Sequence, residues 1–229
     1  MKTARVRNTS AGKSRKRWTP ILRALEWILL FFGVPLIIYL DRDFIHPSIL
    51  IFPVLVFIFV VMKVTTDFSF RELVRWNIPR QVLVRNGVIL LACLLLMLGY
   101  VAIFEPGELF NLPRRNPWVF VAMCFFYPVF SAYGQEIIYR TFIFRRYRNL
   151  FSKKWLFILA SGISFSFLHI AYYDPVSMVL TFIGGIYLAQ VYWQTRSVLF
   201  TTVLHGVLGI IVFGVGLGQY FWLDMPLNI

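Results

Sequence analysis

Long runs of apolar residues, separated by short polar and basic stretches, dominate the pattern of this chain. Seven such runs can be drawn, at residues 25–40, 49–62, 88–104, 118–133, 155–172, 176–193 and 198–221. A straight helix needs about 20 apolar residues to cross the hydrocarbon core of a bilayer, so the first two runs are short. The pattern predicts an all-α fold, a polytopic bundle of about seven transmembrane helices.

The composition agrees with a membrane protein. The chain is 59% hydrophobic and only 14% charged, with a mean hydropathy of +0.72, whereas soluble domains are about one quarter charged. Residues 1–17 are polar and basic without periodicity, which predicts a disordered cytoplasmic tail. The apolar run that follows has no Ala-x-Ala-like cleavage site at its end, so we expect an uncleaved first span. Residues 18–229 are predicted to form a single transmembrane domain.

The distribution of positive charge predicts the orientation. With the N-terminus in the cytoplasm, all but Arg42, Arg114 and Arg115 of the 23 Lys and Arg residues fall in cytoplasmic segments. This split matches the positive-inside rule and puts the C-terminus outside. The net charge of +13 raises the question of nucleic-acid binding. Because the basic residues lie at the ends of apolar runs, we do not expect a nucleic-acid partner; the partner is the lipid bilayer.

Three ionisable residues lie in or at the edge of these apolar runs: Glu136, His169 and His205. Such groups cost several kcal/mol in hydrocarbon and usually face the bundle interior, where they mark a functional site. A structural role is the alternative for each of them. Arg140, one helical turn after Glu136, could simply neutralise a structural carboxylate, and either histidine could be a hydrogen-bonded core residue.

One carboxylate and two imidazoles are also the ligand set of a zinc peptidase. Glu136, His169 and His205 are therefore candidate ligands for Zn²⁺ or another divalent metal ion, although the spacing is not that of HExxH. The same residues could equally hold a water molecule without a metal, with a side chain acting as base. Cys93 and Cys124 lie inside apolar runs without CxxC spacing and are not expected to bind metal.

The predicted boundaries put Glu136 and His169 at different depths. Glu136 follows the inner end of run 118–133, and His169 lies near the outer end of run 155–172. At 1.5 Å of rise per residue these depths differ by roughly 20 Å. A shared site therefore requires the fourth span to continue inward past Arg140, or the fifth to start deeper. Arg145, Arg146 and Arg148 are interpreted as charges at the cytoplasmic edge.

The motifs around these residues resemble those of the CAAX protease and bacteriocin-processing family of intramembrane peptidases. That family carries Glu-Glu-x-x-x-Arg, Phe-x-x-x-His and His-x-x-x-Asn on successive membrane helices. The corresponding residues in this chain are Gln135-Glu136-Ile137-Ile138-Tyr139-Arg140, Phe165-Ser166-Phe167-Leu168-His169, and His205. The resemblance covers about residues 118–218. It implies an intramembrane endopeptidase, with Glu136, Arg140, His169 and His205 in the roles of the family's matching residues.

Two positions depart from the family pattern. Gln135 stands where the resemblance implies the Glu that activates the attacking water; an amide can orient a water but cannot accept its proton. Gly209 stands where it implies an Asn that helps the second His stabilise the oxyanion. Loss of such a donor typically costs roughly a hundredfold or more in turnover. Gln135 is therefore a site residue whose chemistry is altered.

Three functions remain open from the sequence. The first is a peptidase that cleaves a peptide or a lipidated protein C-terminus with water activated by Glu136 and the histidines, with or without metal. The second is a catalytically inactive family member that acts as a membrane binding or immunity protein. The third is a proton-linked transporter, which the absence of internal repeats disfavours. We expect an integral protein of the bacterial inner membrane.

Overall fold

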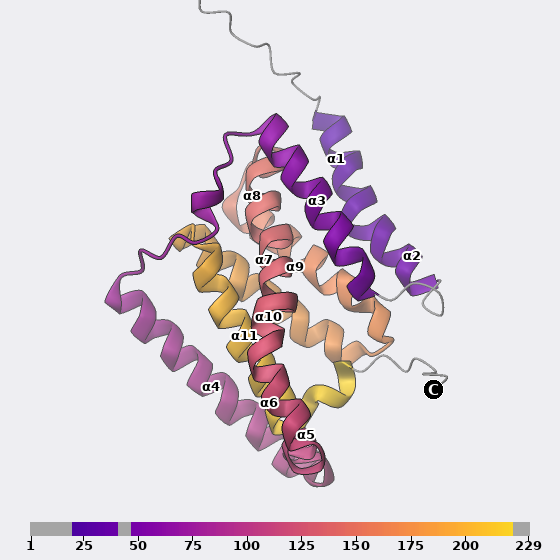
Figure 1. The fold of residues 1–229 in the computed structure, drawn as a ribbon, viewed down its shortest axis with the longest axis vertical. Helices are drawn as coiled ribbons and strands as arrows, with labels where there is room; N and C mark the ends of the chain where they lie inside the picture. The colour runs from indigo at the N-terminus through magenta and orange to yellow at the C-terminus, as the bar shows by residue number, and fades with distance from the viewer. Residues whose placement is uncertain (1–19, 41–46, 222–229) are drawn as a thin grey trace, which may run out of the picture.

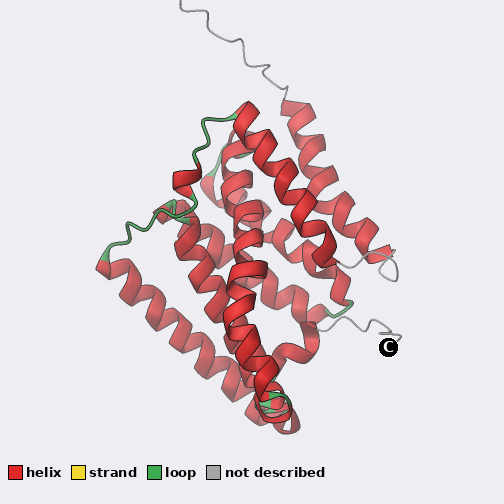
Figure 2. Cartoon of the chain, viewed as in Figure 1, coloured by secondary structure: helices red, strands yellow, loops and turns green. Residues whose placement is uncertain are grey.

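All regular structure that the computed structural model describes, within residues 20–40 and 47–221, is helical (Figure 2). The α-helices are α1 (Pro20–Ile28), α2 (Val34–Leu40), α3 (Pro47–Thr65), α4 (Arg80–Phe104), α5 (Asn111–Arg115), α6 (Pro117–Phe126), α7 (Tyr133–Glu136), α8 (Ile143–Arg146), α9 (Lys154–Leu168), α10 (Pro175–Thr195) and α11 (Val198–Val215). The all-α prediction is confirmed for these residues. The predicted tail, residues 1–17, lies outside them.

Six helices are long and apolar enough to cross a membrane. They are Pro20–Leu40, Arg80–Phe104, Pro117–Arg146, Lys154–Tyr172, Pro175–Thr195 and Val198–Val215. Each overlaps one of the predicted runs, and π-helical turns make the first and third of them continuous. The remaining run, 49–62, corresponds to α3, whose apolar part Phe52–Thr65 is shorter. These helices indicate an integral membrane protein. The count of seven spans and the N-inside orientation stay predictions.

The helix Pro117–Arg146 extends along the length of the bundle (Figure 1), and its second half, residues 134–146, is mostly buried. Helix α10 packs along α9, and α11 packs against both α4 and the Tyr127–Ala132 turn of the long helix. Just over half of the apolar stretch of α11 is buried, whereas almost none of that of α4 is. Helix α11 is therefore a core helix, and α4 presents most of its surface outward.

Local signals fix the ends of the helices that carry the histidines. Ser197 caps α11 by accepting a hydrogen bond from the Phe200 N–H at 3.1 Å, so that His205 follows two turns into the helix. Helix α9 ends at Leu168, and His169 begins a 3₁₀ turn that stops at Tyr173, whose φ is 57°. His169 thus lies where the helix tightens and ends.

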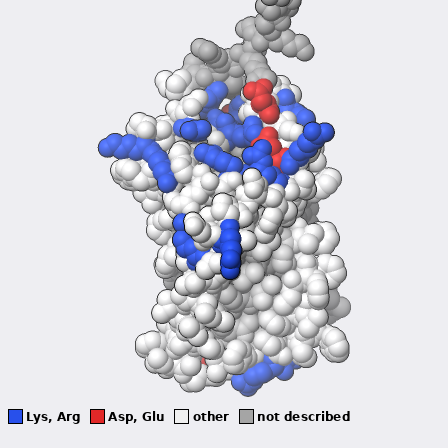
Figure 3. Space-filling view, turned by 90° about the vertical axis from the view of Figure 1, so that its left-hand side faces the viewer, with Lys and Arg blue, Asp and Glu red and all other residues white. Residues whose placement is uncertain are grey.

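Lys and Arg side chains gather at the end of the bundle where α1 begins and α8 ends, with smaller groups at mid-height and at the opposite end (Figure 3). Two of the Arg residues that were interpreted as charges at the cytoplasmic edge have acidic partners. Arg146 is buried and makes a bidentate ion pair with Glu26, at 2.7 and 2.8 Å, and Arg145 pairs with Glu72. Burial of Arg146 requires this partner, because an unpaired guanidinium would be too costly there.

Glycines bring α9 and α10 into close contact beside Phe165. A Cβ added to Gly185 would lie 3.2 Å from both the Cα and the carbonyl oxygen of Gly162, and 3.1 Å from Cδ1 of Phe165. Small residues allow such backbone approach between membrane helices. By contrast, a Cβ on the neighbouring Gly184 would meet nothing within 4 Å.

We expect Gly185→Ala to lower the free energy of unfolding by about 1–3 kcal/mol, because the backbones of α9 and α10 must separate. Gly184→Ala is the matched control; its added methyl group meets open space, and the better helix propensity of Ala favours it by up to about 1 kcal/mol. Chemical unfolding of both variants in detergent micelles, followed by tryptophan fluorescence, measures the difference. Equal stability of the two variants would contradict the close packing.

Candidate active site

The helix that carries Glu136 continues well past the predicted boundary at Tyr133. It extends from Pro117 to Arg146, with two π-helical turns, Tyr127–Ala132 and Ile137–Phe142, on either side of α7. Pro128 lacks the N–H that an α-helical turn would use, which favours the first of these wide turns. Such turns occur frequently at functional sites. The fourth apolar run was predicted to end at Tyr133; the helix continues past it and past Arg140, as a shared site required, and Glu136 and Arg140 are completely buried.

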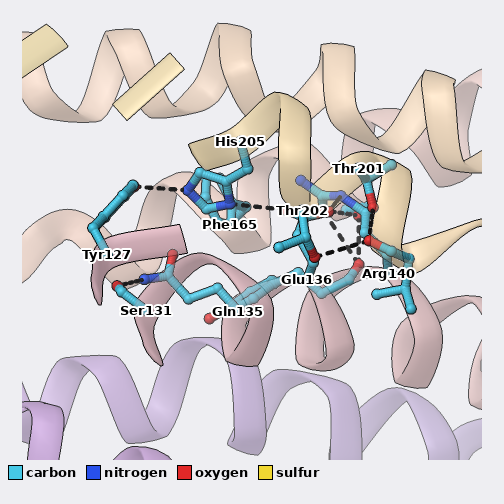
Figure 4. A network of polar contacts seen from close by, with 12 residues as sticks. Tyr127, Ser131, Gln135, Glu136, Arg140, Phe165, Thr201, Thr202 and His205 are labelled. Atoms are coloured by element: carbon cyan, nitrogen blue, oxygen red, sulfur yellow. Dashed lines mark hydrogen bonds and ion pairs between the residues drawn. The ribbon is translucent and has the colours of Figure 1, made fainter. Parts of the chain in front are cut away.

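Glu136 is completely buried and makes two charged contacts. Its Oε1 lies 3.0 Å from Nδ1 of His205, and its Oε2 lies 3.3 Å from Nε of Arg140 (Figure 4). The first contact joins two helices across 69 residues of sequence, and the second joins successive turns of one helix. The guanidinium beside Glu136 favours its carboxylate form, and the carboxylate in turn orients the imidazole.

Arg140 is held by the surrounding helices as well as by Glu136. Its Nη1 donates to the carbonyl oxygen of Tyr139 at 3.2 Å and to Oγ of Ser161 at 3.1 Å. Its guanidinium carbon lies 5.1 Å from the centroid of the Phe165 ring. A buried guanidinium with a carboxylate, a hydroxyl and an aromatic ring around it is a rigid part of the site.

His205 is contacted on both of its ring nitrogens. Nδ1 faces Glu136, and Nε2 lies 3.0 Å from the hydroxyl oxygen of Tyr127. The close approach of α11 depends on Gly206 and Gly209: a Cβ on Gly206 would lie 2.9 Å from Cβ of Pro128, and one on Gly209 would overlap the ring of Tyr127. The sequence His205-Gly206-x-x-Gly209 therefore places the imidazole directly on the long helix.

His169 does not touch Glu136 directly. Its Nδ1 lies 2.9 Å from the carbonyl oxygen of Phe165, and its ring centroid lies 4.9 Å from that of Phe165. The same Phe165 ring contacts His205, at 5.4 Å, and the guanidinium of Arg140. All of these groups therefore share one region of the bundle. The predicted depth difference disappears because the long helix continues past Arg140.

Gln135 is half-buried and turns along its own helix. Its Nε2 donates to Oγ of Ser131 at 2.9 Å, and its buried Oε1 has no hydrogen-bond partner within the described part of the chain. In Figure 4 the amide points toward the side of the helix where Tyr127 lies. Gln135 thus keeps one polar atom available on that side.

The candidate metal ligands do not form a ready ligand set. Within residues 20–40 and 47–221, no three His, Cys, Asp or Glu side chains come close enough together to hold a metal ion. The two oxygens of Glu136 face His205 and Arg140, and a guanidinium beside the carboxylate opposes a second cation. The metal site stays a prediction.

Comparison with known protein families agrees with this site. Residues 116–211 match the family model described as type II CAAX prenyl endopeptidase Rce1-like. This part of the chain is similar to the Rce1-like family. The matched segment begins at the start of the long helix and ends after His205, so the Rce1-like segment contains Gln135, Glu136, Arg140 and both histidines. The resemblance expected from the motifs is confirmed for these residues, and the family they resemble is one of CAAX prenyl endopeptidases. No match was found among the curated proteins or among the solved structures.

Sequence reasoning missed two contacts of the Rce1-like site. Tyr127, bound to His205, belongs to none of the motifs and lies 78 residues away in sequence. Ser161, which is bound to Arg140, lies one turn before Phe165. The surrounding sequence has the pattern of an ordinary apolar helix, so it does not single out Ser161. Only the glycine spacing after His205 signals that another helix packs closely at this point.

Proposed function

We propose that this chain is an intramembrane endopeptidase that cleaves a peptide bond near the C-terminus of a peptide or a lipidated protein. The observation that carries the proposal is the buried contact of Glu136 with His205, with Arg140 on the second carboxylate oxygen. Burying three ionisable groups in an apolar bundle is expensive, and such groups usually have a function. The Rce1-like match supplies the reaction class.

Glu136 is the orienting carboxylate of the proposed site. It accepts a hydrogen bond from Nδ1–H of His205, so the neutral imidazole carries its lone pair on Nε2. This is the role of the carboxylate in a hydrolytic triad, which fixes the tautomer and stabilises the imidazolium without taking the proton itself. Arg140 keeps Glu136 charged and aligned for this purpose.

His169 is the proposed general base. Its Nδ1–H donates to the Phe165 carbonyl oxygen, so its lone pair is on Nε2, which has no partner among the described residues. Nε2 takes a proton from water as the water oxygen bonds to the scissile carbonyl carbon, and the amide of Gln135 orients that water. The proton then passes from His169 to the leaving nitrogen as the C–N bond breaks.

The membrane location, the partners and the alternative function are also part of the proposal. We place the chain in the bacterial inner membrane with its N-terminus in the cytoplasm, on the charge distribution predicted from the sequence. The bilayer and a peptide or lipidated protein are its partners, and no nucleic acid is required. An inactive binding or immunity role is the alternative, because Gln135 and Gly209 depart from the family pattern.

The test uses purified protein in liposomes and a farnesylated peptide ending in a CAAX sequence. We expect slow cleavage by the natural chain and faster cleavage by Gln135→Glu, because a carboxylate beside the attacking water adds a second proton acceptor to the His169 imidazole. The gain is expected to approach the roughly 10²-fold that a general base contributes at the low end of its range.

Gln135→Ala is the matched control, since it removes the amide without adding a base, and it should cleave no faster than the natural chain. A natural chain that is inactive and stays inactive as Gln135→Glu, while Glu136→Gln and His169→Ala keep the biological function in cells, would point to the binding role instead.

A further inference from the structure

We propose that the Tyr127 hydroxyl is a catalytic hydrogen-bond donor, which stabilises the oxyanion formed from the scissile carbonyl. This inference rests on the proposed endopeptidase function and adds a residue that lies outside all three motifs. Three observations support the inference: the position of the Tyr127 hydroxyl group, the packing that fixes this hydroxyl, and the ring contacts that connect Tyr127 to His169.

The hydroxyl is the last group of a chain of three. Glu136 contacts Nδ1 of His205 at 3.0 Å, and Tyr127 contacts Nε2 of the same ring at 3.0 Å (Figure 4). The carboxylate is buried and paired with Arg140, so it cannot leave the imidazole without losing a charged contact. The imidazole therefore links the charge of Glu136 to the phenol oxygen.

The packing of Tyr127 fixes this hydroxyl in place. A Cβ on Gly209 would lie 2.7 Å from Cζ and 2.8 Å from Oη of Tyr127, so the phenol occupies the space that a side chain at position 209 would fill. The next residue, Pro128, packs on Gly206 in the same way. Because the ring has no room to swing toward α11, the hydroxyl is preorganised, as a donor in a catalytic site must be.

Ring contacts place Tyr127 and His169 in one closed cluster. One side of the circuit passes from Tyr127 to His205, Phe165 and His169, with centroid separations of 5.9, 5.4 and 4.9 Å. The other side returns through Phe221 and Phe213, with separations of 6.2, 6.1 and 6.3 Å. The proposed base and the proposed donor therefore belong to the same apolar enclosure, in which hydrogen bonds to a developing charge are strong.

The chemistry requires two states of His205. When His205 is neutral, Tyr127 donates its proton to Nε2. When His205 has taken up a proton from solvent before the substrate binds, Nε2–H donates to Oη instead, and the phenol O–H is released to donate to the substrate oxygen. His205 keeps this proton throughout, while the proton of the attacking water passes through His169. The charge that develops as water adds to the carbonyl is then held by a donor that is itself polarised by the imidazolium, while Glu136 stabilises that imidazolium.

Tyr127→Phe tests the proposal because it removes only the hydroxyl and keeps the ring against Gly209. In liposomes with the farnesylated CAAX peptide, we expect kcat to fall by about 10²–10³-fold with little change in KM, as for loss of one oxyanion donor. Tyr133→Phe is the matched control: its hydroxyl lies on the same helix but donates to the Leu73 carbonyl oxygen at 3.1 Å, and turnover should stay unchanged.

A second variant asks whether a donor at the same place restores activity. Since a Cβ at position 209 would lie 2.8 Å from Oη, an Asn amide there reaches the hydroxyl position once the ring is removed. Tyr127→Ala with Gly209→Asn should recover part of the turnover that Tyr127→Ala loses. Wild-type kcat in Tyr127→Phe, or a kcat above it, would overturn the donor role while leaving the endopeptidase function intact. An inactive natural chain would overturn both.

Discussion

Replacing Arg140 with Met is expected to lower the free energy of unfolding by about 3–5 kcal/mol, the usual cost of removing one partner from a buried ion pair. Arg140 and Glu136 are both completely buried, with Nε and Oε2 3.3 Å apart. Without the guanidinium, the Glu136 carboxylate loses its only full positive charge among the described residues and keeps the contact with the His205 imidazole. Ser161 also loses the N–H that donates to its hydroxyl. Chemical unfolding in detergent micelles measures the loss.

Two further variants separate the buried charge from other effects. Arg145→Met removes a guanidinium from the same helix, but its pair with Glu72 is partly exposed, so the cost should stay within about 1 kcal/mol. Glu136→Gln combined with Arg140→Met removes both charges and keeps an acceptor for His205, so most of the stability should return. If Arg140→Met costs no more than Arg145→Met, the buried pair does not hold the helices together.

Hydropathy predicted the helices of this bundle well because the lipid-facing and core residues are both apolar. Each of the six candidate spans overlaps a predicted run. The fourth apolar run ends at Tyr133 because Gly134, Gln135 and Glu136 follow, whereas the helix itself continues to Arg146. When hydropathy is averaged along the chain, a polar residue at the end of a span is assigned to the cytoplasmic segment that follows. In the structure those residues face other helices, which is a property of packing and not of composition.

The motifs named several residues that meet inside the bundle, but they did not predict how these residues are arranged. They named Glu136, Arg140 and His205, which the structure brings into contact, and they did not indicate that the Nε2 of His205 meets Tyr127. That contact depends on how closely α11 approaches the long helix at Gly209. The departure at Gly209, which appeared as a missing donor in the sequence, has a physical explanation in the packing, since any side chain there would displace the Tyr127 ring.

Ion pairs at the basic end of the bundle were also beyond sequence reasoning. Arg146 and Glu26 are 120 residues apart, and their bidentate contact joins α1 to the end of the long helix. The hydroxyl of Tyr147 donates to the same carboxylate at 2.9 Å. Positive charge at a membrane edge has a sufficient explanation in topology, so nothing in the pattern distinguishes a paired Arg from a solvated one.

Replacing His169 with Ala is expected to reduce cleavage of the farnesylated peptide by about 10²–10⁴-fold, the range that a positioned general base contributes. The fold should change little, because the only hydrogen bond of the His169 ring within the described chain is to the Phe165 carbonyl oxygen one turn earlier. Ser166→Ala is the matched control on α9. It loses a 2.7 Å hydrogen bond to Met178 between helices, and should lower stability slightly without lowering turnover.

The loss in His169→Ala is expected to be partly reversed by free imidazole, because a soluble base can occupy the space that the side chain leaves and accept the proton of the attacking water. His205→Ala should not respond in the same way, since its ring links Glu136 to Tyr127 and acts through fixed geometry at both nitrogens. Rescue of His205→Ala but not of His169→Ala would exchange the two roles, with the base at Nε2 of His205. Full turnover in His169→Ala would remove the base role from His169 and leave the Glu136–His205 pair as the part of the site that activates water.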